Sequence, residues 1–253
     1  MRYISIDLGD IDKAYIIPIS DIHIGDPLTD YGKLTRYLNW VKENPAWIIL
    51  NGDLLTCDTK QSIGDVYRQE LTPQQQLEEL VRIFSPFQDK IIGVTAGNHE
   101  LRIQKEVGVD LLRVFTQLLK IEDKYDPDSL LIHIRIGRDS FKKRIGYTIF
   151  VTHGWSNGRK AGGKINAIQE LRNIILADCY IVSHTHTQGA VIEKYLMPDY
   201  RNKKILEIKQ AFVSAGSFLK YGGYAERKGL PITKTGTPRI RFDGTRKDIH
   251  VSL

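Results

Sequence analysis

The chain has 253 residues, 42% hydrophobic and 26% charged, a balance typical of a globular protein with a substantial core. No apolar run approaches the roughly 20 residues that span a membrane, and Asp7, Asp10 and Asp12 interrupt the N-terminal stretch, so neither a membrane span nor a signal peptide is expected. The only two cysteines, Cys57 and Cys179, exclude a disulfide scaffold and predict free thiols in a reducing cytoplasm.

The first half of the chain is predicted to alternate strands with helices. Three β-branched runs have the composition of buried strands, at 14–19, 46–50 and 90–95. Three segments carry apolar residues at helical spacing, at 34–41, 77–84 and 111–119. The second of these has a Thr72-Pro73 start, and proline suits the first helical turn. This alternation is typical of an α/β protein.

From about residue 130 the predicted strands become denser. Further strands are expected at 131–134, 147–151, 180–182, 189–196, 204–214, 238–243 and 248–252. His133 and His250 alternate with apolar neighbours there and are expected to be structural. One helix is expected near 164–176, and the glycine-, proline- and lysine-rich stretch Gly222 to Pro238 is expected to be a long surface loop. No linker or internal repeat divides the chain, so we expect one domain over 1–253.

Five short polar stretches directly follow apolar, strand-like runs. They are Asp21-Ile22-His23, Asn51-Gly52-Asp53, Gly97-Asn98-His99-Glu100, Thr152-His153-Gly154 and Ser183-His184-Thr185-His186. These stretches contain five of the seven histidines of the chain. Ligands of α/β proteins gather at the carboxyl ends of strands, so the pattern predicts one metal site rather than separate turns and buried structural histidines.

In this order the five stretches resemble the motifs of the calcineurin-like metallophosphoesterase family, over roughly residues 14 to 218. The resemblance implies a fold of two stacked β-sheets, a β-sandwich, flanked by α-helices. One position departs from the family pattern, because Ser183 stands where the family usually has glycine. Both histidines that follow Ser183 are retained.

The resemblance also implies a centre for two divalent metal ions. It assigns seven ligands: the bridging Asp53, then Asp21, His23 and His186 on the first ion, and Asn98, His153 and His184 on the second. Two ions about 3.5–4 Å apart polarise phosphoryl oxygens and lower the pKa of a bridging water, which makes hydroxide available near neutral pH. Imidazole, carboxylate and amide donors suit manganese, iron, zinc or nickel better than calcium, and they do not identify the metal. Manganese is expected, with iron, zinc, nickel or magnesium as alternatives.

By the same resemblance, His99 is the general acid that protonates the leaving oxygen, a role that contributes about 10²–10⁴ in rate. Glu100 either orients His99 or occupies the first turn of the next helix, where the helix dipole favours a carboxylate; the second role is preferred. Arg102 either contacts the substrate phosphate or pairs with an acidic neighbour.

The segment Gly158 to Lys164 has the GxxxxGK spacing of a P-loop. Ile165 occupies the position where a nucleotide-binding loop needs Ser or Thr, so an ATPase is not expected. We expect Arg159, Lys160 and Lys164 to bind the substrate phosphate, and the alternative is a solvated loop.

Charge is distributed unevenly along the chain. Residues 1–100 carry 9 basic and 15 acidic side chains, a net charge of −6, whereas residues 201–253 carry 12 and 4, a net charge of +8. This basic C-terminal segment suits a polyanion, and Phe218, Tyr221 and Tyr224 within it are candidates for stacking on bases. The alternative is a solvated strand face.

These observations predict a phosphoesterase that hydrolyses phosphodiester bonds of nucleic acid or nucleotides, with no membrane partner. A phosphomonoesterase, a protein phosphatase and a catalytically silent metal-binding scaffold are the alternatives. The complete ligand set and His99 argue against the scaffold. The sequence makes no prediction of the oligomeric state.

Overall fold

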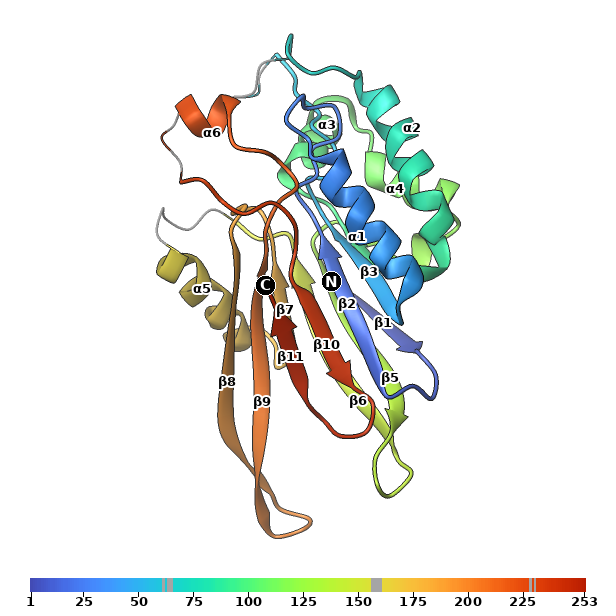
Figure 1. The fold of residues 1–253 in the computed structure, drawn as a ribbon, viewed down its shortest axis with the longest axis vertical. Helices are drawn as coiled ribbons and strands as arrows, with labels where there is room; N and C mark the ends of the chain where they lie inside the picture. Colours follow the sequence, from blue (N-terminus) through green and yellow to red (C-terminus); the bar gives the residue numbers. More distant parts are fainter. Residues whose placement is uncertain (61, 63–65, 156–160, 228, 230) are drawn as a thin grey trace.

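The computed structural model of the chain describes residues 1–60, 62, 66–155, 161–227, 229 and 231–253. Two β-sheets pack face to face, and helices cover both outer faces (Figure 1). This arrangement confirms the predicted α/β fold with two stacked, helix-flanked sheets. No helix in the described part of the chain has the length and hydropathy needed to span a membrane.

The first sheet has five strands in the order β11-β10-β2-β3-β4. Its strands are β2 (Lys13–Ile19), β3 (Ala46–Asn51), β4 (Ile91–Thr95), β10 (Arg239–Asp243) and β11 (Ile249–Ser252). Strands β2, β3 and β4 run parallel, so their carboxyl ends lie at the same edge of the sheet. Strand β10 runs antiparallel to both β2 and β11.

The second sheet has six strands in the order β1-β5-β6-β7-β9-β8. Its strands are β1 (Arg2–Asp7), β5 (Ser129–Arg138), β6 (Arg144–Thr152), β7 (Cys179–Val182), β8 (Gln188–Asp199) and β9 (Lys204–Ala215). Strands β6, β7 and β9 run parallel, and the antiparallel hairpins β5–β6 and β8–β9 flank β7.

Helices pack on the outer face of the five-stranded sheet. They are α1 (Tyr31–Glu43), α2 (Pro73–Phe84), α3 (Asn98–Val107) and α4 (Leu111–Leu118), with the 3-10 turns η1 (Ser85–Lys90) and η2 (Glu122–Lys124). Helix α2 starts as predicted: the Thr72 hydroxyl accepts from the Gln75 amide, and the Gln75 side chain accepts from the Thr72 amide. Leu77, Leu80 and Phe84 are buried, and each such side chain contributes about 1.5–3 kcal/mol of hydrophobic free energy.

The core between the sheets is a continuous apolar layer. Ile16 and Ile49 of the five-stranded sheet meet Ile149, Ile181 and Val213 of the six-stranded sheet, all without solvent exposure. Because the strands that carry the five motifs end at the same end of this sandwich, the core fixes the positions from which the motif side chains project.

Helix α5 (Ala161–Gln169) and the turn η3 (Glu170–Asn173) cover the outer face of the six-stranded sheet. The helix expected near 164–176 therefore begins earlier and ends as a 3-10 turn. Underneath it, Phe150, Tyr180 and Phe212 are buried, and the rings of Tyr180 and Phe212 stack with centroids 4.9 Å apart.

Two further features differ from the sequence prediction. Strand β1 was not predicted, because polar residues interrupt its apolar ones, yet it pairs in parallel with β5. The expected loop from Gly222 to Pro238 contains the short helix α6 (Gly223–Arg227), and near its end Thr237 is buried with its hydroxyl bonded to the Pro18 carbonyl.

The two histidines expected to be structural lie in strands. His133 lies half-buried in β5, as predicted, whereas His250 in β11 is exposed.

Phe218 corrects a prediction about base stacking. Its ring is fully buried and packs edge-on against Tyr37 with centroids 5.7 Å apart, so it is part of the core and unavailable to a base. Tyr221 is 41% exposed.

Candidate metal centre

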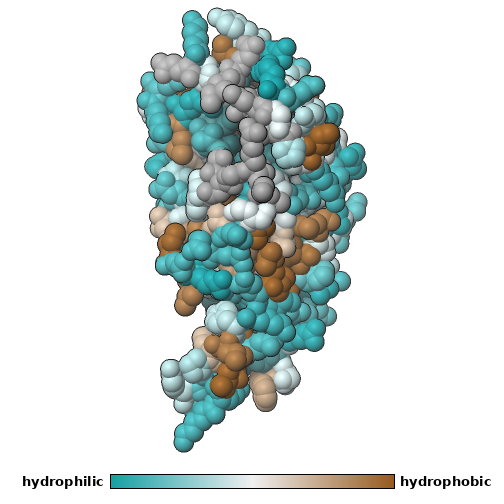
Figure 2. Space-filling view, turned by 90° about the vertical axis from the view of Figure 1, so that its left-hand side faces the viewer, coloured by the Kyte–Doolittle hydropathy of each residue, from teal (hydrophilic) through white to brown (hydrophobic). Residues whose placement is uncertain are grey.

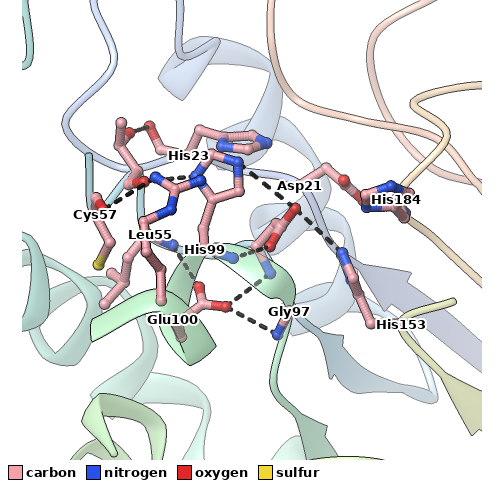
Figure 3. Close-up of polar contacts among 12 residues, drawn as sticks. Asp21, His23, Leu55, Cys57, Gly97, His99, Glu100, His153 and His184 are labelled. Carbon is pink, nitrogen blue, oxygen red and sulfur yellow. Dashed lines mark hydrogen bonds and ion pairs between the residues drawn. The ribbon is translucent and has the colours of Figure 1, made fainter. Parts of the chain in front are cut away.

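The five motif stretches converge at one end of the sandwich. Asp21 and His23 follow β2, Asp53 follows β3, His153 follows β6, and His184 and His186 follow β7. Their ligand atoms form three overlapping groups, each with its atoms within 4.8 Å of one another: Asp21, His23 and His186; Asp53, His153 and His184; and His23, Asp53 and His99. Figure 3 shows Asp21, His23, His99, His153 and His184 of these groups gathered in one place.

Carboxylates and imidazoles are in close contact within this cluster. Nε2 of His153 lies 3.1 Å from Oδ2 of Asp53, and Nε2 of His186 lies 3.1 Å from Oδ1 of Asp21. Nε2 of His99 lies 4.0 Å from Oδ2 of Asp53. Asp53 therefore lies between the two sets of histidines, the position that a bridging carboxylate needs.

The backbone of the cluster is strained in a way that aims the side chains. Five of the candidate ligands adopt positive φ angles: Asp21 (48°), His23 (55°), Asp53 (48°), His184 (65°) and His186 (53°). Each such residue costs roughly 1–3 kcal/mol, and such strain concentrates at functional sites. At His23 the carbonyl accepts from the hydroxyls of Thr29 (2.7 Å) and Thr56 (2.8 Å), which hold the strained turn in place.

Two glycines allow the motif turns to approach one another. A Cβ on Gly97 would collide with the Asp53 side chain and backbone amide. A Cβ on Gly52, whose φ is 73°, would come within 2.6 Å of the Gly97 amide nitrogen. The two turns therefore pack closer than any larger residue permits.

Burial and close charges shift the pKa values of the cluster. Although burial favours the neutral acid, His153 and His99 hold the pKa of Asp53 well below its usual range. Burial opposes the charged form of His153 as well, but the Asp53 carboxylate outweighs it and raises the pKa of His153 to about 10. At His23, burial and neighbouring His99 lower the pKa well below its usual value.

The donor set fits divalent metal ions. The buried Nε2 of His23 has no hydrogen-bond partner, although buried polar atoms are usually paired. The buried Asp21 Oδ1 and His153 Nε2 have only the imidazole–carboxylate contacts described above. A metal ion coordinated by these atoms would satisfy them. Imidazole nitrogens and carboxylate oxygens together are typical ligands of first-row transition metals.

His99 is placed at the edge of this cluster. Its Nδ1 donates to the Thr56 carbonyl at 2.6 Å, so Nε2 is the nitrogen that faces Asp53. The neighbouring Asn98 is exposed at the first position of α3. Its amide is thus less enclosed than the other predicted ligands.

Glu100 lies in the first turn of α3, the role preferred from the sequence, and it also holds the Asp53 turn. Its buried Oε2 accepts from the amides of Gly97 (2.9 Å) and Asp53 (3.1 Å), and Oε1 accepts from the Leu55 amide (2.9 Å) (Figure 3). Burial and the nearby Asp53 carboxylate raise the pKa of Glu100.

Asn51 forms a buried hydrogen-bond network that the sequence analysis did not identify. Its Nδ2 donates to Ser183 Oγ (2.6 Å) and to the Thr152 carbonyl (3.0 Å), and its Oδ1 accepts from the Thr95 hydroxyl (2.6 Å). Its carbonyl accepts from Nδ1 of His153 (2.7 Å). This bond leaves Nε2 of His153 facing the cluster. The adjacency of Asn51 to the Gly52-Asp53 motif was the available signal.

The predicted substrate-binding residues have different surroundings. Arg102 donates to Asp58 Oδ1 at 2.9 Å, so it pairs with an acidic neighbour, one of the two roles considered. Lys164 donates to the Thr185 carbonyl (3.0 Å) and the Thr187 hydroxyl (2.7 Å), and so braces the turn that carries His184 and His186. Arg159 and Lys160 lie outside the described residues.

Comparison with known proteins gives one family match. The model of the calcineurin-like phosphoesterase family matches residues 15–206, which is most of the chain. No match was found among curated proteins.

Several solved structures are similar in fold. A conserved uncharacterized protein from Streptococcus pneumoniae, described as a predicted phosphoesterase, shares 16% identity with a TM-score of 0.40, and the alignment covers 95% of this chain and 90% of that one. A metallophosphoesterase from Sphaerobacter thermophilus shares 15% identity with a TM-score of 0.42, covering 94% and 88%. A Vps29 double mutant from Entamoeba histolytica shares 11% identity with a TM-score of 0.40, covering 95% and 99%.

Proposed function

Because this chain belongs to the calcineurin-like phosphoesterase family and is a metal-dependent phosphoesterase, we propose that it hydrolyses phosphodiester bonds of nucleic acid or nucleotides. The observation that carries the proposal is the joining of the three ligand groups through Asp53 and His23. Each of these two side chains belongs to two groups, so the cluster is large enough for a dinuclear centre of the kind the family uses.

We assign the ligands as the motif order suggests. Asp53 is the shared carboxylate, Asp21, His23 and His186 hold one ion, and Asn98, His153 and His184 hold the other. Support comes from the three groups of ligand atoms and from the buried Nε2 of His23, which has no hydrogen-bond partner. When bound, the two metal ions would neutralise charge at the phosphoryl oxygens and lower the pKa of the attacking water. Manganese is the metal we propose first.

His99 acts as the general acid in this proposal. Its Nδ1–H donates to the Thr56 carbonyl, so the proton passed to the leaving oxygen is the second one, on Nε2 of the imidazolium form, and the ring is left neutral with Nδ1–H in place. We propose that two cations near the cluster contribute positive charge near the substrate phosphate. They are Arg102, which pairs with Asp58, and Lys164, which donates to the turn that carries His184 and His186. The same role is proposed for Arg159 and Lys160.

The preference for a nucleic acid or nucleotide is supported by charge. Within the basic C-terminal segment, Lys209 and Lys247 are neutralised by Asp248 and Asp178. Lys203 and Lys204, in contrast, are exposed at the β8–β9 hairpin turn, at the end of the sheet opposite the candidate metal centre, so they support a polymeric substrate that extends beyond that centre.

Two further proposals concern the chain as a whole. We propose that residues 1–253 form one domain, because the first strand and the last two strands are built into the two sheets. A reducing, cytoplasmic environment is also proposed, in agreement with the buried free thiols of Cys57 and Cys179.

The test is a parallel assay of a phosphodiester and a phosphomonoester. Protein stripped of metal and reloaded with Mn²⁺ is expected to hydrolyse bis-p-nitrophenyl phosphate faster than p-nitrophenyl phosphate. Asp53→Asn and His99→Ala should abolish turnover, whereas His250→Ala, a change at an exposed histidine on β11, should leave it unchanged. Faster hydrolysis of the monoester would point to a phosphatase, and absence of turnover with metal bound would point to a scaffold.

A further inference from the structure

The edge of the six-stranded sheet opposite the candidate metal centre carries two hairpin turns. The carboxyl ends of β6 and β7 deliver the candidate ligands, and β9 runs parallel to both. The turns that precede β6 and β9 therefore lie at the far edge, and both are at the lower end of Figure 1. We refer to residues 139–143 and 199–204 as the two hairpin tips.

Each hairpin tip combines an exposed aromatic ring with exposed cations. Phe141 is 81% exposed beside the exposed Lys142 and Lys143. Tyr200 is 86% exposed in a turn that carries three exposed cations, Arg201, Lys203 and Lys204. Rings of this size are usually buried, so two exposed ones at the same edge suggest a binding function.

These five cations are not neutralised by ion pairs. Within the part of the chain that the structure describes, none of them has a carboxylate oxygen within 4.0 Å, whereas the nearby Arg138 and Arg144 pair with Asp10 and Asp7. The hairpin tips contain two carboxylates, and both hold their turns: Asp139 accepts from the amides of Phe141 and Lys143, and Asp199 accepts from the backbone and side-chain amides of Asn202. The five cations outnumber these two carboxylates. The tips therefore present net positive charge at two places.

We propose that the two hairpin tips bind single-stranded nucleic acid outside the metal centre. The cations would contact phosphates, and the rings of Phe141 and Tyr200 would stack on unpaired bases, a combination used by proteins that bind single strands. The midlines of the two hairpins are three strand intervals apart in the sheet order, about 14 Å at 4.7–4.9 Å per interval, so a single strand can reach both. The inference rests on the proposed function for its choice of nucleic acid among polyanions.

The order of side chains along the β8–β9 hairpin disfavours an anionic membrane as the partner. Leu196 is 70% exposed and Ile205 is 69% exposed, and both lie behind the charged turn. Figure 2 shows the lower end of the molecule with a hydrophilic extremity and hydrophobic residues above it. Insertion of Leu196 and Ile205 into lipid would carry Arg201 and Lys203 deeper than the headgroups, at a high cost in free energy.

The binding test uses the full chain in EDTA, with folding checked by circular dichroism, so that cleavage and metal–phosphate contacts are absent. Anisotropy of a fluorescent 20-residue oligothymidylate is measured over a range of salt concentrations. Lys142→Ala/Lys143→Ala and Lys203→Ala/Lys204→Ala should each reduce the slope of log affinity against log salt, by about 0.7 for each phosphate that the variant no longer neutralises. Phe141→Ala/Tyr200→Ala should raise Kd about tenfold or more with little change in slope.

A matched control is Lys42→Ala/Lys105→Ala, which removes two exposed charges from helices α1 and α3. It should leave Kd and slope unchanged; equal weakening by this pair, or unchanged binding in the tip variants, overturns the proposal. Binding to phosphatidylserine vesicles without binding to the oligonucleotide also overturns it, in favour of a lipid surface. With Mn²⁺ present, all variants should hydrolyse bis-p-nitrophenyl phosphate at the rate of the unaltered protein. If the unaltered protein itself does not hydrolyse this diester, that result counts against the proposed function and not against nucleic-acid binding by the hairpin tips.

Discussion

Asn51 connects the strands that carry the candidate ligands without being a candidate itself. Its side chain and carbonyl reach Thr95 at the end of β4, Thr152 and His153 at the end of β6, and Ser183 after β7. A hydrogen bond to one ring nitrogen of a histidine fixes the other nitrogen as the one that faces a metal ion. Ser183, which departs from the glycine usual in the family, is thus an accepting partner within this network.

Asn51→Ala is expected to destabilise the fold and weaken metal binding. The buried hydroxyls of Thr95 and Ser183 would lose a partner, so the free energy of unfolding should fall by about 1–3 kcal/mol. Mn²⁺ affinity should fall by less than the roughly 10–100-fold that follows loss of a direct partner of a ligand, because the Asn51 carbonyl that accepts from Nδ1 of His153 belongs to the backbone and remains. Urea unfolding and Mn²⁺ titration measure the two effects.

Ser183→Gly is the matched variant for this network. It should lower the free energy of unfolding by less than Asn51→Ala does, because Asn51 Nδ2 keeps the Thr152 carbonyl as an acceptor. The double variant should lose less stability than the sum of the two single variants, since the shared hydrogen bond is removed only once. Strict additivity would mean that the Asn51–Ser183 bond contributes nothing.

Proton release should accompany metal binding at His153. Its pKa of about 10 means that the ring is protonated at neutral pH in the metal-free protein, and a metal ion must displace that proton. Lower pH favours the protonated form, so apparent Mn²⁺ affinity should fall about tenfold per pH unit for each proton released between pH 8 and pH 6. Calorimetry in buffers of different ionisation enthalpy counts the protons, and pH-independent affinity would contradict the expectation.

The turns after β3 and β4 form a single packed element around Asp53. Glu100 of α3 accepts hydrogen bonds from the amides of Gly97, Asp53 and Leu55. At Gly97 there is no room for a Cβ beside Asp53. The position of the Asp53 carboxylate therefore depends on the start of a helix that follows a different strand.

Gly97→Ala should displace Asp53 and reduce kcat for the diester by about 10² or more, since small misplacement of a catalytic group has effects of this size. Gly163→Ala is the control, because a Cβ there meets no atom within 4 Å and the residue lies inside helix α5. That change should raise the free energy of unfolding by about 0.5–1 kcal/mol and leave kcat unchanged. An unchanged kcat in Gly97→Ala would show that the Gly97 turn can move away from Asp53 without a loss of activity.

At the scale of the whole molecule, the two sheets bring buried carboxylates, buried histidines and strained turns together at one end. A metal ion bound there would stabilise the folded state. Metal bound to the folded state and not to the unfolded chain should stabilise the protein by about 2.7 kcal/mol at a free concentration 100 times Kd. We expect EDTA to lower Tm, and Mn²⁺ to restore it in the unaltered protein. In Asp53→Asn, Mn²⁺ should restore much less. Equal Tm values with EDTA and Mn²⁺ would indicate that no ion binds in the folded state.

The sequence by itself determined every described strand except β1, several of the helices and the positions of the motif residues. These are local features: apolar runs of strand length, apolar residues at helical spacing, and polar residues immediately after them. The convergence of Asp21 and Asp53 also followed, because the parallel strands β2 and β3 end at the same edge of one sheet. His153 follows β6 of the other sheet, so its approach to Asp53 depends on how the two sheets stack.

Only the tertiary structure decided which distant groups touch. It placed Asn51 against Ser183, 132 residues away, paired Arg102 with Asp58, and buried Phe218. It also divided the basic C-terminal segment between two sheets and brought Lys142 to the same edge as Lys203. Such contacts depend on strand order and register, which arise from packing across the whole core, and a local pattern of residues carries no record of them.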